Sequence, residues 1–351
     1  MKKDYLMTDL FAQFIKASKL GYRRKQDGNK IKPQTIENYT YVLKLIQDFE
    51  NDCNKSIRIR SVSGLQARQL KVEMNYWKRF YTQFSDYLFK VKGCYDNYVG
   101  HVFKILRVFF NFLEKEKMIQ VNLFKTHFYV RKEEVGIVTL MPEQLRFLIF
   151  DKTFEETLLK SLRTTKDVFV FGCTTGLRCS DIFNLRFRDI VQQESHYYLA
   201  MRAVKTGVIT RVKLPPYIID IVSKRRRNKS DSSKIFTPIS NVQFNKNIRK
   251  LAECAGWTHI VGKQRSRNGV QVEQINCTIK KTYRFCDLLS SHTMRRTAIT
   301  NMLMLGMSEQ VVRNISGHSP KSTSFYRYVN FAQTYIDSEI NKMHERMQPV
   351  G

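Results

Sequence analysis

Long hydrophobic runs and paired cysteines are both missing from this sequence. No segment approaches the roughly 18 consecutive apolar residues of a membrane-spanning helix, so we expect no membrane span. The 7 cysteines are odd in number and show no CxxC spacing, which argues against a disulfide framework and against a zinc site. The N-terminal segment meets Asp4 and Asp9 before any apolar core forms, which is unlike a secretory signal. Together these absences predict a soluble protein with free thiols in a reducing, cytoplasmic compartment.

Acidic residues are scarce as well. The sequence has 31 Asp and Glu against 60 Lys and Arg, which gives a formal net charge of +29. Such an excess of one sign destabilises a compact chain by self-repulsion unless a polyanion or salt neutralises it. Nucleic acid is therefore the partner that we expect, with an anionic membrane surface or a ribosomal setting as the alternatives. An interface made mainly with phosphates predicts an affinity that falls steeply with salt.

Several common catalytic motifs are also absent. We find no P-loop, no GxGxxG, no HxxxH or Cys/His set with metal-ligand spacing, and no carboxylate pair suited to acid–base work. The sequence therefore predicts no metal and no cofactor. The reactive side chains that remain are tyrosine, histidine, arginine and lysine, a set that can act on a phosphodiester.

Hydrophobic periodicity divides the chain into two domains, which agrees with its length of 351 residues. Apolar residues recur at helical spacing in residues 7–18, 33–50, 74–91 and 96–116. This pattern predicts a helical bundle over residues 1–125. Residues 126–138 lose the helical period and mix charges with β-formers, which indicates a linker. Residues 139–351 then form the second domain.

The second domain mixes helices with a few strands, so the fold class that we predict is mainly α with a small β-sheet. A helix should end at Gly176, two strands within residues 196–213 should turn at Thr206–Gly207, and residues 259–285 should form an irregular or hairpin insert. The remaining helices are expected at residues 179–186, 217–226, 240–256, 291–305, 308–316 and 330–347.

The stretch 291–328 carries the densest set of reactive side chains. His292 and Arg295 are three residues apart at the start of a helix, so both project from the same side of its first turn. With the positive end of the helix dipole they form a candidate anion site. His318 follows the end of the next helix, and Tyr326 and Tyr328 come soon after. Tyrosine is a weak nucleophile and needs cations around it and around the phosphate that it attacks.

Other candidate cations lie upstream. Arg178 follows the helix break at Gly176, and Asp181, three residues later, can orient it. Lys205 lies at the expected hairpin turn, where it can reach a bound strand. The basic loop of residues 19–32 either contacts DNA phosphates or is a solvated surface. Its candidate DNA-binding residues are Arg23, Arg24, Lys25, Lys30 and Lys32, and Arg296 is a further candidate outside the loop.

Taken together, these motifs resemble those of a known family. TTGLRCSDIFNLRFRDI (174–190), KTG (205–207), HTMRR (292–296), SGH (316–318) and a terminal tyrosine resemble, in order and spacing, the motif set of tyrosine recombinases of the phage-integrase type. The similarity covers residues 139–330. Residues 7–120 resemble the SAM-like core-binding domain of these enzymes. The particular residues within the motifs resemble those of integrases of mobile elements in Bacteroides-type bacteria.

The resemblance implies roles for the cations. Arg178 and Arg295 would clamp the scissile phosphate and stabilise the transition state, with Asp181 bracing Arg178. Lys205 would protonate the leaving 5′ oxygen. His292 would act as an acid–base group or phosphate ligand. The tyrosine would then form a 3′-phosphotyrosyl link, which needs neither ATP nor a divalent metal.

The histidine–tyrosine spacing departs from the family pattern. The resemblance implies that His318 hydrogen-bonds the phosphate, and in the family the attacking tyrosine usually follows this histidine by nine residues. Here Tyr326 lies eight residues after His318 and Tyr328 lies ten after it. A TTxxY alignment selects Tyr326, whereas [ST]Fx[KR]Y[IV] selects Tyr328 and also matches Arg327 and Val329. We prefer Tyr328 as the nucleophile, with Tyr326 as the alternative.

The resemblance also implies partners. Two domains would close around a double-stranded recombination site, and a homo-oligomer, a tetramer in the synapse, would assemble on DNA. The tail helix 330–347 would dock on a neighbouring protomer, or else pack on its own domain. The expected outcome is integration or excision of a mobile element, or DNA inversion, in the cytoplasm of a bacterium. The alternatives are a non-catalytic DNA-binding protein of the same fold and a type IB topoisomerase.

Overall fold

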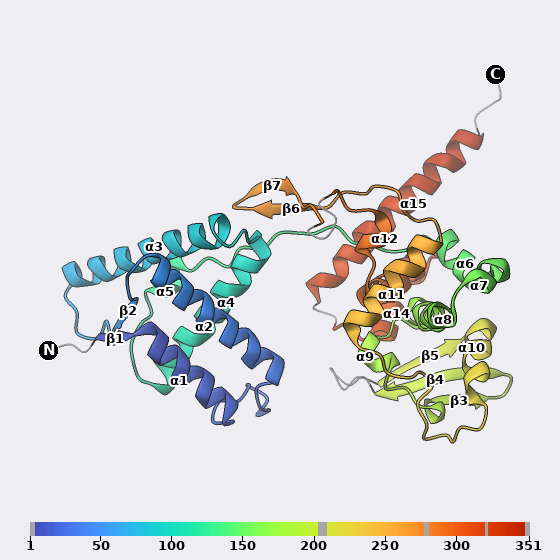
Figure 1. The fold of residues 1–351 in the computed structure, drawn as a ribbon, viewed down its shortest axis with the longest axis horizontal. Helices are drawn as coiled ribbons and strands as arrows, with labels where there is room; N and C mark the ends of the chain where they lie inside the picture. The colour runs from blue at the N-terminus through green and yellow to red at the C-terminus, as the bar shows by residue number, and fades with distance from the viewer. Residues whose placement is uncertain (1–3, 203–208, 277–280, 320–321, 348–351) are drawn as a thin grey trace. The chain divides into compact units, whose positions relative to one another are not determined.

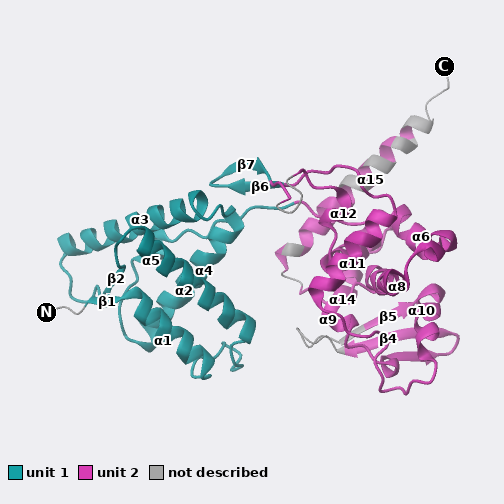
Figure 2. Ribbon diagram, in the orientation of Figure 1, with its two compact units in different colours: residues 1–135, 264–273 teal, residues 136–263, 274–351 magenta. Residues whose placement is uncertain are grey.

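The computed structural model describes residues 4–202, 209–276, 281–319 and 322–347. The chain folds into two compact units, and Figure 2 colours them separately. Unit 1 runs to Val135 and also includes the later segment Gln264–Glu273, whereas unit 2 contains Gly136–Lys263 and the chain from Gln274 onward. Within the described residues, no helix is long and apolar enough to cross a lipid bilayer. The predicted fold class, mainly α with small β-sheets, is confirmed (Figure 1).

Unit 1 is a helical bundle with two small antiparallel strand pairs. Its elements are β1 (Asp4–Leu6), α1 (Met7–Lys19), α2 (Pro33–Asp52), β2 (Arg58–Arg60), α3 (Ala67–Lys90), α4 (Asp96–Glu116), α5 (Phe124–His127), β6 (Gln264–Arg267) and β7 (Val270–Glu273). β1 pairs with β2, and β6 pairs with β7. The amphipathic stripes read from the sequence face inward, and α2 begins at Pro33, where the missing N–H of proline is harmless.

Aromatic rings fill the core of unit 1. The indole of Trp77, on α3, meets the ring of Phe110, on α4, edge-to-face at 5.0 Å between centroids. Phe80 and Phe84 stack on each other in the same core. Edge-to-face and offset arrangements stabilise such cores beyond the burial of area alone. The aromatic stripes of these helices are therefore packing surfaces.

The segment predicted as a linker begins inside this core. Phe128 is fully buried and its ring lies 5.3 Å from that of Phe110. Further along, the chain runs against α4 so closely that a Cβ at Gly100 would lie 1.9 Å from the carbonyl oxygen of Arg131. Residues up to Val135 consequently belong to the first compact unit.

A hairpin from the second half of the sequence completes unit 1. β6 and β7 pair across Asn268 and Gly269, so the predicted insert contains a true β-hairpin. The buried carboxylate of Asp96, at the start of α4, accepts hydrogen bonds from the Ser266 hydroxyl and from the backbone N–H groups of Asn268 and Gly269, the latter two at 2.9 Å.

A second buried carboxylate holds the same hairpin. Glu133 accepts a hydrogen bond from the Ser266 backbone N–H and pairs with the Arg265 guanidinium at 2.6 Å. The guanidinium groups of Arg265 and Arg267 lie 4.7 and 4.9 Å from the ring of Tyr95. Buried carboxylates are stable only when they are paired in this way, so the hairpin is an integral part of unit 1.

Unit 2 combines a helical body with a three-stranded antiparallel sheet of order β3-β4-β5. Its first half contains α6 (Pro142–Phe150), α7 (Lys152–Thr157), α8 (Lys160–Thr175), α9 (Cys179–Ile182), a 3-10 turn (Phe187–Asp189), β3 (Ile190–Gln193), β4 (His196–Arg202) and β5 (Ile209–Leu214). Its second half contains α10 (Pro216–Arg226), α11 (Asn241–Cys254), α12 (Phe285–Leu288), α13 (Ser291–Met304), α14 (Glu309–Ser316), a second 3-10 turn (Thr323–Phe325) and α15 (Tyr326–Met347).

A close approach between α8 and α13 determines where the polar side chains of α13 lie. A Cβ at Gly172 would lie 2.6 Å from Sδ and 2.9 Å from Cβ of Met294, so only glycine lets the two helices pack at this distance. α8 ends four residues later at Gly176, whose φ of 68° is left-handed and favours glycine. Because Arg295 follows Met294, this contact brings it to the C-terminal end of α8.

α15 begins earlier than the tail helix that the sequence predicts. Its first residue is Tyr326 rather than a residue near 330, so both candidate tyrosines lie in its first turn. Tyr328 and Val329 pack against the small core that α13 and α15 share. α15 is therefore anchored at its N-terminal end, next to the polar residues of α13.

Candidate active site

One cavity in unit 2 gathers most of the predicted reactive residues. It has a volume of about 700 Å³ and is lined by residues from α9, α11, α13 and α15 and from the loops between them. Arg178, His292, Arg295, His318 and Tyr328 all line it. Residues separated by up to 150 positions in the sequence therefore meet at one place.

Arg295 is held by the ends of two helices. Its Nη1 donates to the Gly176 carbonyl at the end of α8 (2.8 Å), and its Nη2 donates to the Ser316 carbonyl at the end of α14. The negative ends of helix dipoles favour a cation at such positions. Burial and the nearby Arg178 lower the pKa of Arg295 to about 10, so it still carries its charge at pH 7. These bonds fix the guanidinium without using a carboxylate to neutralise it.

Arg178 is the residue that precedes α9. Its guanidinium lies 4.0 Å from the carboxylate of Asp181, which is 1% exposed. Because the Asp181 carboxylate is buried, solvent screens this pair less than it would screen a pair on the surface. The distance is consistent with the bracing role that the resemblance implies, and Arg178 also lines the cavity.

His318 follows the left-handed Gly317 that ends α14. Its Nδ1 lies 2.8 Å from the Ser316 hydroxyl and 3.3 Å from Nη2 of Arg295. Burial, followed by the charges of Arg295, Arg178 and Arg313, lowers the pKa of His318 to about 4. The imidazole is therefore neutral at pH 7.

The two tyrosines have different surroundings. The ring of Tyr328 lies 5.9 Å from that of His318 and lines the cavity. Tyr326 is 55% exposed, its ring lies 5.3 Å from the guanidinium carbon of Arg313, and it is not among the described residues that line the cavity.

Of two further predicted residues, the structure describes one. Arg296 lines the cavity beside Arg295. Lys205 falls outside the described residues, as do Thr206 and Gly207 of the expected turn. The strands β4 and β5 that flank this segment pair in the register Arg202↔Ile209, as the predicted hairpin requires.

Sequence reasoning missed the residues that hold the start of α13. The Ser291 backbone N–H donates to the Asn245 side chain at 2.8 Å, and its hydroxyl donates to the Asn241 side chain at 3.0 Å. Both asparagines come from α11, and Asn241 lines the cavity with Ser291. Nothing local in the sequence signals this contact, because the partners lie 46 and 50 residues apart.

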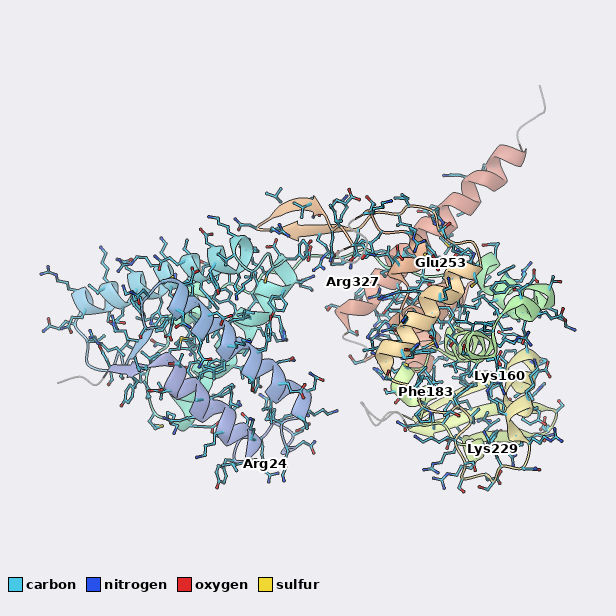
Figure 3. All side chains as sticks on the ribbon, viewed as in Figure 1. Arg24, Lys160, Phe183, Lys229, Glu253 and Arg327 are labelled. Carbon is cyan, nitrogen blue, oxygen red and sulfur yellow. The ribbon has the colours of Figure 1, made fainter. Side chains whose placement is uncertain are left out.

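The basic loop of unit 1 divides into exposed and buried residues. Arg24, Lys25, Lys30 and Lys32 are exposed, and Figure 3 shows Arg24 at the surface. Arg23 differs from the expected phosphate contact. Its guanidinium is buried, donates to the Ser18 hydroxyl at 2.8 Å, and lies 4.1 Å from the ring of Phe14 and 3.5 Å from a Glu116 oxygen. It stabilises the core of unit 1 because these neighbours surround it.

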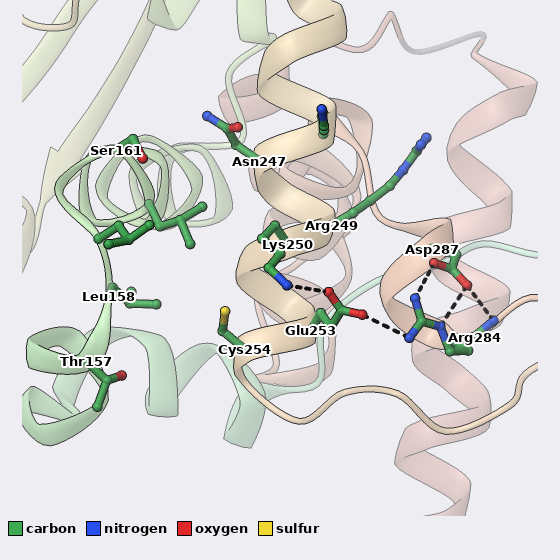
Figure 4. A pocket seen from close by; sticks show the side chains of 13 residues that line it. Thr157, Leu158, Ser161, Asn247, Arg249, Lys250, Glu253, Cys254, Arg284 and Asp287 are labelled. Carbon is green, nitrogen blue, oxygen red and sulfur yellow. Dashed lines mark hydrogen bonds and ion pairs between the residues drawn. The ribbon is translucent and has the colours of Figure 1, made fainter. Parts of the chain in front are cut away.

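A second cavity in unit 2, of about 460 Å³, has a different electrostatic character (Figure 4). Glu253 pairs with Lys250 at 2.9 Å and with Arg284 at 3.0 Å, and Arg284 also pairs with Asp287 at 3.0 Å. These cations are neutralised by neighbouring acids. The cavity around Arg295 instead concentrates positive charge with the buried Asp181 as the nearby acid, so it is the better site for a phosphate.

Across the described part of the chain, no cluster of three His, Cys, Asp or Glu is placed to hold a metal ion.

The comparison with family models decides the assignment. Residues 151–334, more than half of the 351-residue chain, match the model described as the phage integrase family. The chain belongs to the phage integrase family. The resemblance to tyrosine recombinases of the phage-integrase type, which the motifs predicted, is thereby confirmed. A search of curated protein sequences finds no match.

Solved structures of tyrosine recombinases share the fold. The integrase of transposon Tn1549 (residues 82–397), in complex with circular intermediate DNA, matches with a TM-score of 0.56 and 16% identity over 92% of this chain and 94% of that one. XerH bound to its difH substrate matches with a TM-score of 0.54 and 11% identity over 92% and 81%. A lambda integrase dimer bound to a COC′ core site matches with 0.52 and 15% over 95% of both chains. At these identities the likeness is one of fold.

Proposed function

We propose that this member of the phage integrase family is a site-specific DNA recombinase that cleaves and rejoins strands through a 3′-phosphotyrosyl intermediate. The observation that carries the proposal is the cavity of about 700 Å³, which brings three arginines, two histidines and one tyrosine together. Charge on a phosphodiester increases in the transition state, and preorganised donors aimed at that charge are the largest contribution to such catalysis. The biological outcome would be integration or excision of a mobile element, or inversion.

Each residue has a proposed role in one balanced step. The hydroxyl oxygen of Tyr328 attacks phosphorus, the bond from phosphorus to the 5′ oxygen breaks, and the 3′ phosphate remains esterified to tyrosine. His292 takes the tyrosine proton, and Lys205 gives a proton to the leaving 5′ oxygen. Arg178 and Arg295 hold the non-bridging oxygens, and the fixed hydrogen bonds of Arg295 keep it in place without reorganisation.

Rejoining is the reverse of this step with a 5′-hydroxyl from a second strand. The phosphotyrosyl ester conserves the energy of the broken bond, so strand exchange needs neither ATP nor a metal. Asp181 keeps Arg178 oriented in both directions of the reaction, because its carboxylate lies 4.0 Å from the guanidinium.

Double-stranded DNA is the proposed partner of both units. The net charge of +29 and the exposed Arg24, Lys25, Lys30 and Lys32 support contacts with the phosphate backbone. The related integrase, XerH and lambda integrase structures are complexes with DNA. We expect binding to weaken linearly on a plot of log affinity against log salt, and a flat plot would contradict a phosphate-dominated interface.

A homo-oligomer is the proposed active assembly, with four protomers in the synapse and α15 docking on a neighbour. The C-terminal part of α15 extends away from the other helices of unit 2 (Figure 1), and Ile340 on this part is 44% exposed. A helix without packing is only marginally stable in water, so a partner surface would stabilise it. Crosslinking on DNA, with and without residues 336–351, tests this assembly.

A nicked suicide duplex tests the function. It should carry the protein's own site, identified from inverted repeats or an attachment site beside the gene. Covalent capture followed by joining to a second duplex supports a recombinase. Capture with religation of the same duplex alone indicates a type IB topoisomerase. DNA binding without capture indicates a non-catalytic protein of this fold.

A further inference from the structure

One buried guanidinium lies against both residues at the start of α15. Arg313, on α14, is 7% exposed, and its guanidinium carbon lies 4.0 Å from the centre of the Phe325 ring. The same carbon lies 5.3 Å from the centre of the Tyr326 ring. Phe325 is fully buried, whereas Tyr326 is 55% exposed. Arg313 therefore contacts a buried ring and the exposed ring that follows it in the sequence.

Two groups hold the guanidinium of Arg313 in place. Its Nη1 donates to the Ser319 carbonyl at 3.3 Å, and its Nη2 lies 3.6 Å from a carboxylate oxygen of Glu309. Glu309 is the first residue of α14, and Ser319 follows the end of this helix. A cation over an aromatic ring is attracted to it, and more strongly where water is excluded. Arg313 therefore forms a fixed wall of the pocket that Phe325 occupies.

The position of Phe325 decides which tyrosine faces the cavity. Phe325 and Tyr328 are three residues apart, which places them on the same side of a helix, and their ring centres lie 6.0 Å apart. Tyr328 lines the cavity of about 700 Å³. For Tyr326 to take this place, the residue three positions before it, Thr323, would have to fill the pocket of Phe325. Thr323 is exposed and polar and has no ring to meet the guanidinium. The pocket therefore favours the register that puts Tyr328 in the cavity.

We propose that Arg313 is a positioning residue that selects Tyr328, and not Tyr326, as the nucleophile. One contact of its guanidinium keeps Phe325 buried, and the other keeps Tyr326 at the surface. This selection would decide between two tyrosines that the spacing from His318 leaves equal. The role in the attack rests on the proposed function, whereas the contacts of Arg313 are a property of the free protein.

Mass spectrometry of covalently captured protein tests the selection. Trypsin cuts after Arg327, so the two candidate tyrosines lie on different peptides, 322–327 and 328–342. The nucleotide that remains on one peptide after nuclease digestion of the captured DNA then identifies the nucleophile. We expect the wild type to carry this nucleotide on Tyr328, with Tyr326 at background.

Variants of the contact should change which tyrosine is used. In Arg313→Ala, the ratio of Tyr326-linked to Tyr328-linked DNA should rise at least about tenfold, as expected for the loss of a buried cation–π contact. Arg313→Lys keeps a cation beside the ring and should restore most of the preference. Phe325→Leu keeps the pocket apolar but offers no ring, so it should shift the ratio in the same direction, and it replaces Arg313→Ala if that variant does not fold. The matched control is Leu303→Ala, which removes a buried side chain from the core that contains Phe325 and should leave the ratio unchanged.

An unchanged ratio in Arg313→Ala and Phe325→Leu would overturn the proposal. An equal rise in Leu303→Ala would also overturn it, because loss of stability alone would then explain the change. Capture of the wild type mainly through Tyr326 would do the same.

If neither the wild type nor any variant captures DNA, the proposed function fails, and nitration of the free protein by tetranitromethane separately tests the contact. Tyr326 should be nitrated faster than Tyr328 in the wild type. The two rates should converge in Arg313→Ala but not in Leu303→Ala. The same difference in rate in all three proteins would contradict the positioning role of Arg313.

Discussion

Exchange of Tyr328 for phenylalanine is the sharpest test of the active-site geometry. The change removes the hydroxyl that would form the phosphotyrosyl ester, so covalent capture of DNA should fall to background. Tyr326→Phe is the matched control, because it removes the same group two residues away. It should capture DNA at a rate within about twofold of the wild type, as expected for an exposed residue outside the reacting groups.

The structure predicts that both variants stay folded. Tyr326 is 55% exposed, and phenylalanine keeps a ring beside Arg313, so less than about 0.5 kcal/mol of stability should be lost. Tyr328 packs its ring against the small core shared by α13 and α15, and phenylalanine retains that packing. Tyr328 lines the cavity, so the loss of its hydroxyl should cost no more than about 1 kcal/mol.

The assay is a denaturing gel of an end-labelled suicide duplex. Captured DNA moves with the additional mass of the 41.5 kDa chain, and unfolding in urea checks the stability of each variant. The reasoning is refuted if Tyr326→Phe loses capture while Tyr328→Phe keeps it, since the cavity would then not be the place of cleavage. Capture by both single variants would mean that another group attacks the phosphate.

Three further changes probe the features that support this site and unit 1. Asp96→Asn weakens the three hydrogen bonds that hold the hairpin and should lower the free energy of unfolding by about 2–3 kcal/mol in urea melts. The control Asp86→Asn changes an exposed ion pair on α3 and should lower it by less than about 0.5 kcal/mol. Equal losses in the two variants would contradict a buried anchor at Asp96. The folded-state pKa of His318, about 4, lies below the value near 6.5 in an unfolded chain, so the unfolded state binds the extra proton between these values. The wild type should therefore lose more stability than His318→Asn as pH falls from 6.5 to 4, and parallel pH curves would exclude this titration. Gly172→Ala places a Cβ 2.6 Å from a sulfur atom on α13, so it should lower the free energy of unfolding by about 1–3 kcal/mol and slow cleavage. In the control Gly136→Ala, no atom lies within 4 Å of the new Cβ, so stability should change little. Equal effects on unfolding would mean that the contact between α8 and α13 is not tight.

The long helices could be predicted from the sequence because their signals are local. The apolar stripe over residues 96–116 predicted a helix with the bounds that α4 has. The start of α15 was missed because its first turn has no strong capping residue and reads as part of the preceding loop. The helix instead begins at Tyr326, because residues such as Val329 pack against α13. Tertiary packing, rather than propensity, decides this boundary.

Side-chain surroundings were harder to predict than helices. Arg23 and Arg24 are neighbours in the same basic loop, yet Arg23 is buried against Phe14 and Arg24 is exposed. A run of like charges does not reveal which member meets an aromatic pocket assembled from distant helices. The contact of Ser291 with α11 could not be predicted either, because its partners are also distant in the sequence. The motif residues could be grouped, because the family pattern supplies long-range information that a single sequence lacks.

The hairpin of residues 264–273 has a consequence for synthesis of the protein on the ribosome. The last residue of the hairpin, Glu273, emerges 138 residues after Val135 (273 − 135), the end of the first continuous part of unit 1. At about 5–20 residues per second this interval lasts roughly 7–28 s. During it, the carboxylates of Asp96 and Glu133 must stay hydrated or find temporary partners. Folding of the first half of the chain is therefore completed only by its last third, so a nascent chain truncated before residue 264 should remain open to proteases around the start of α4.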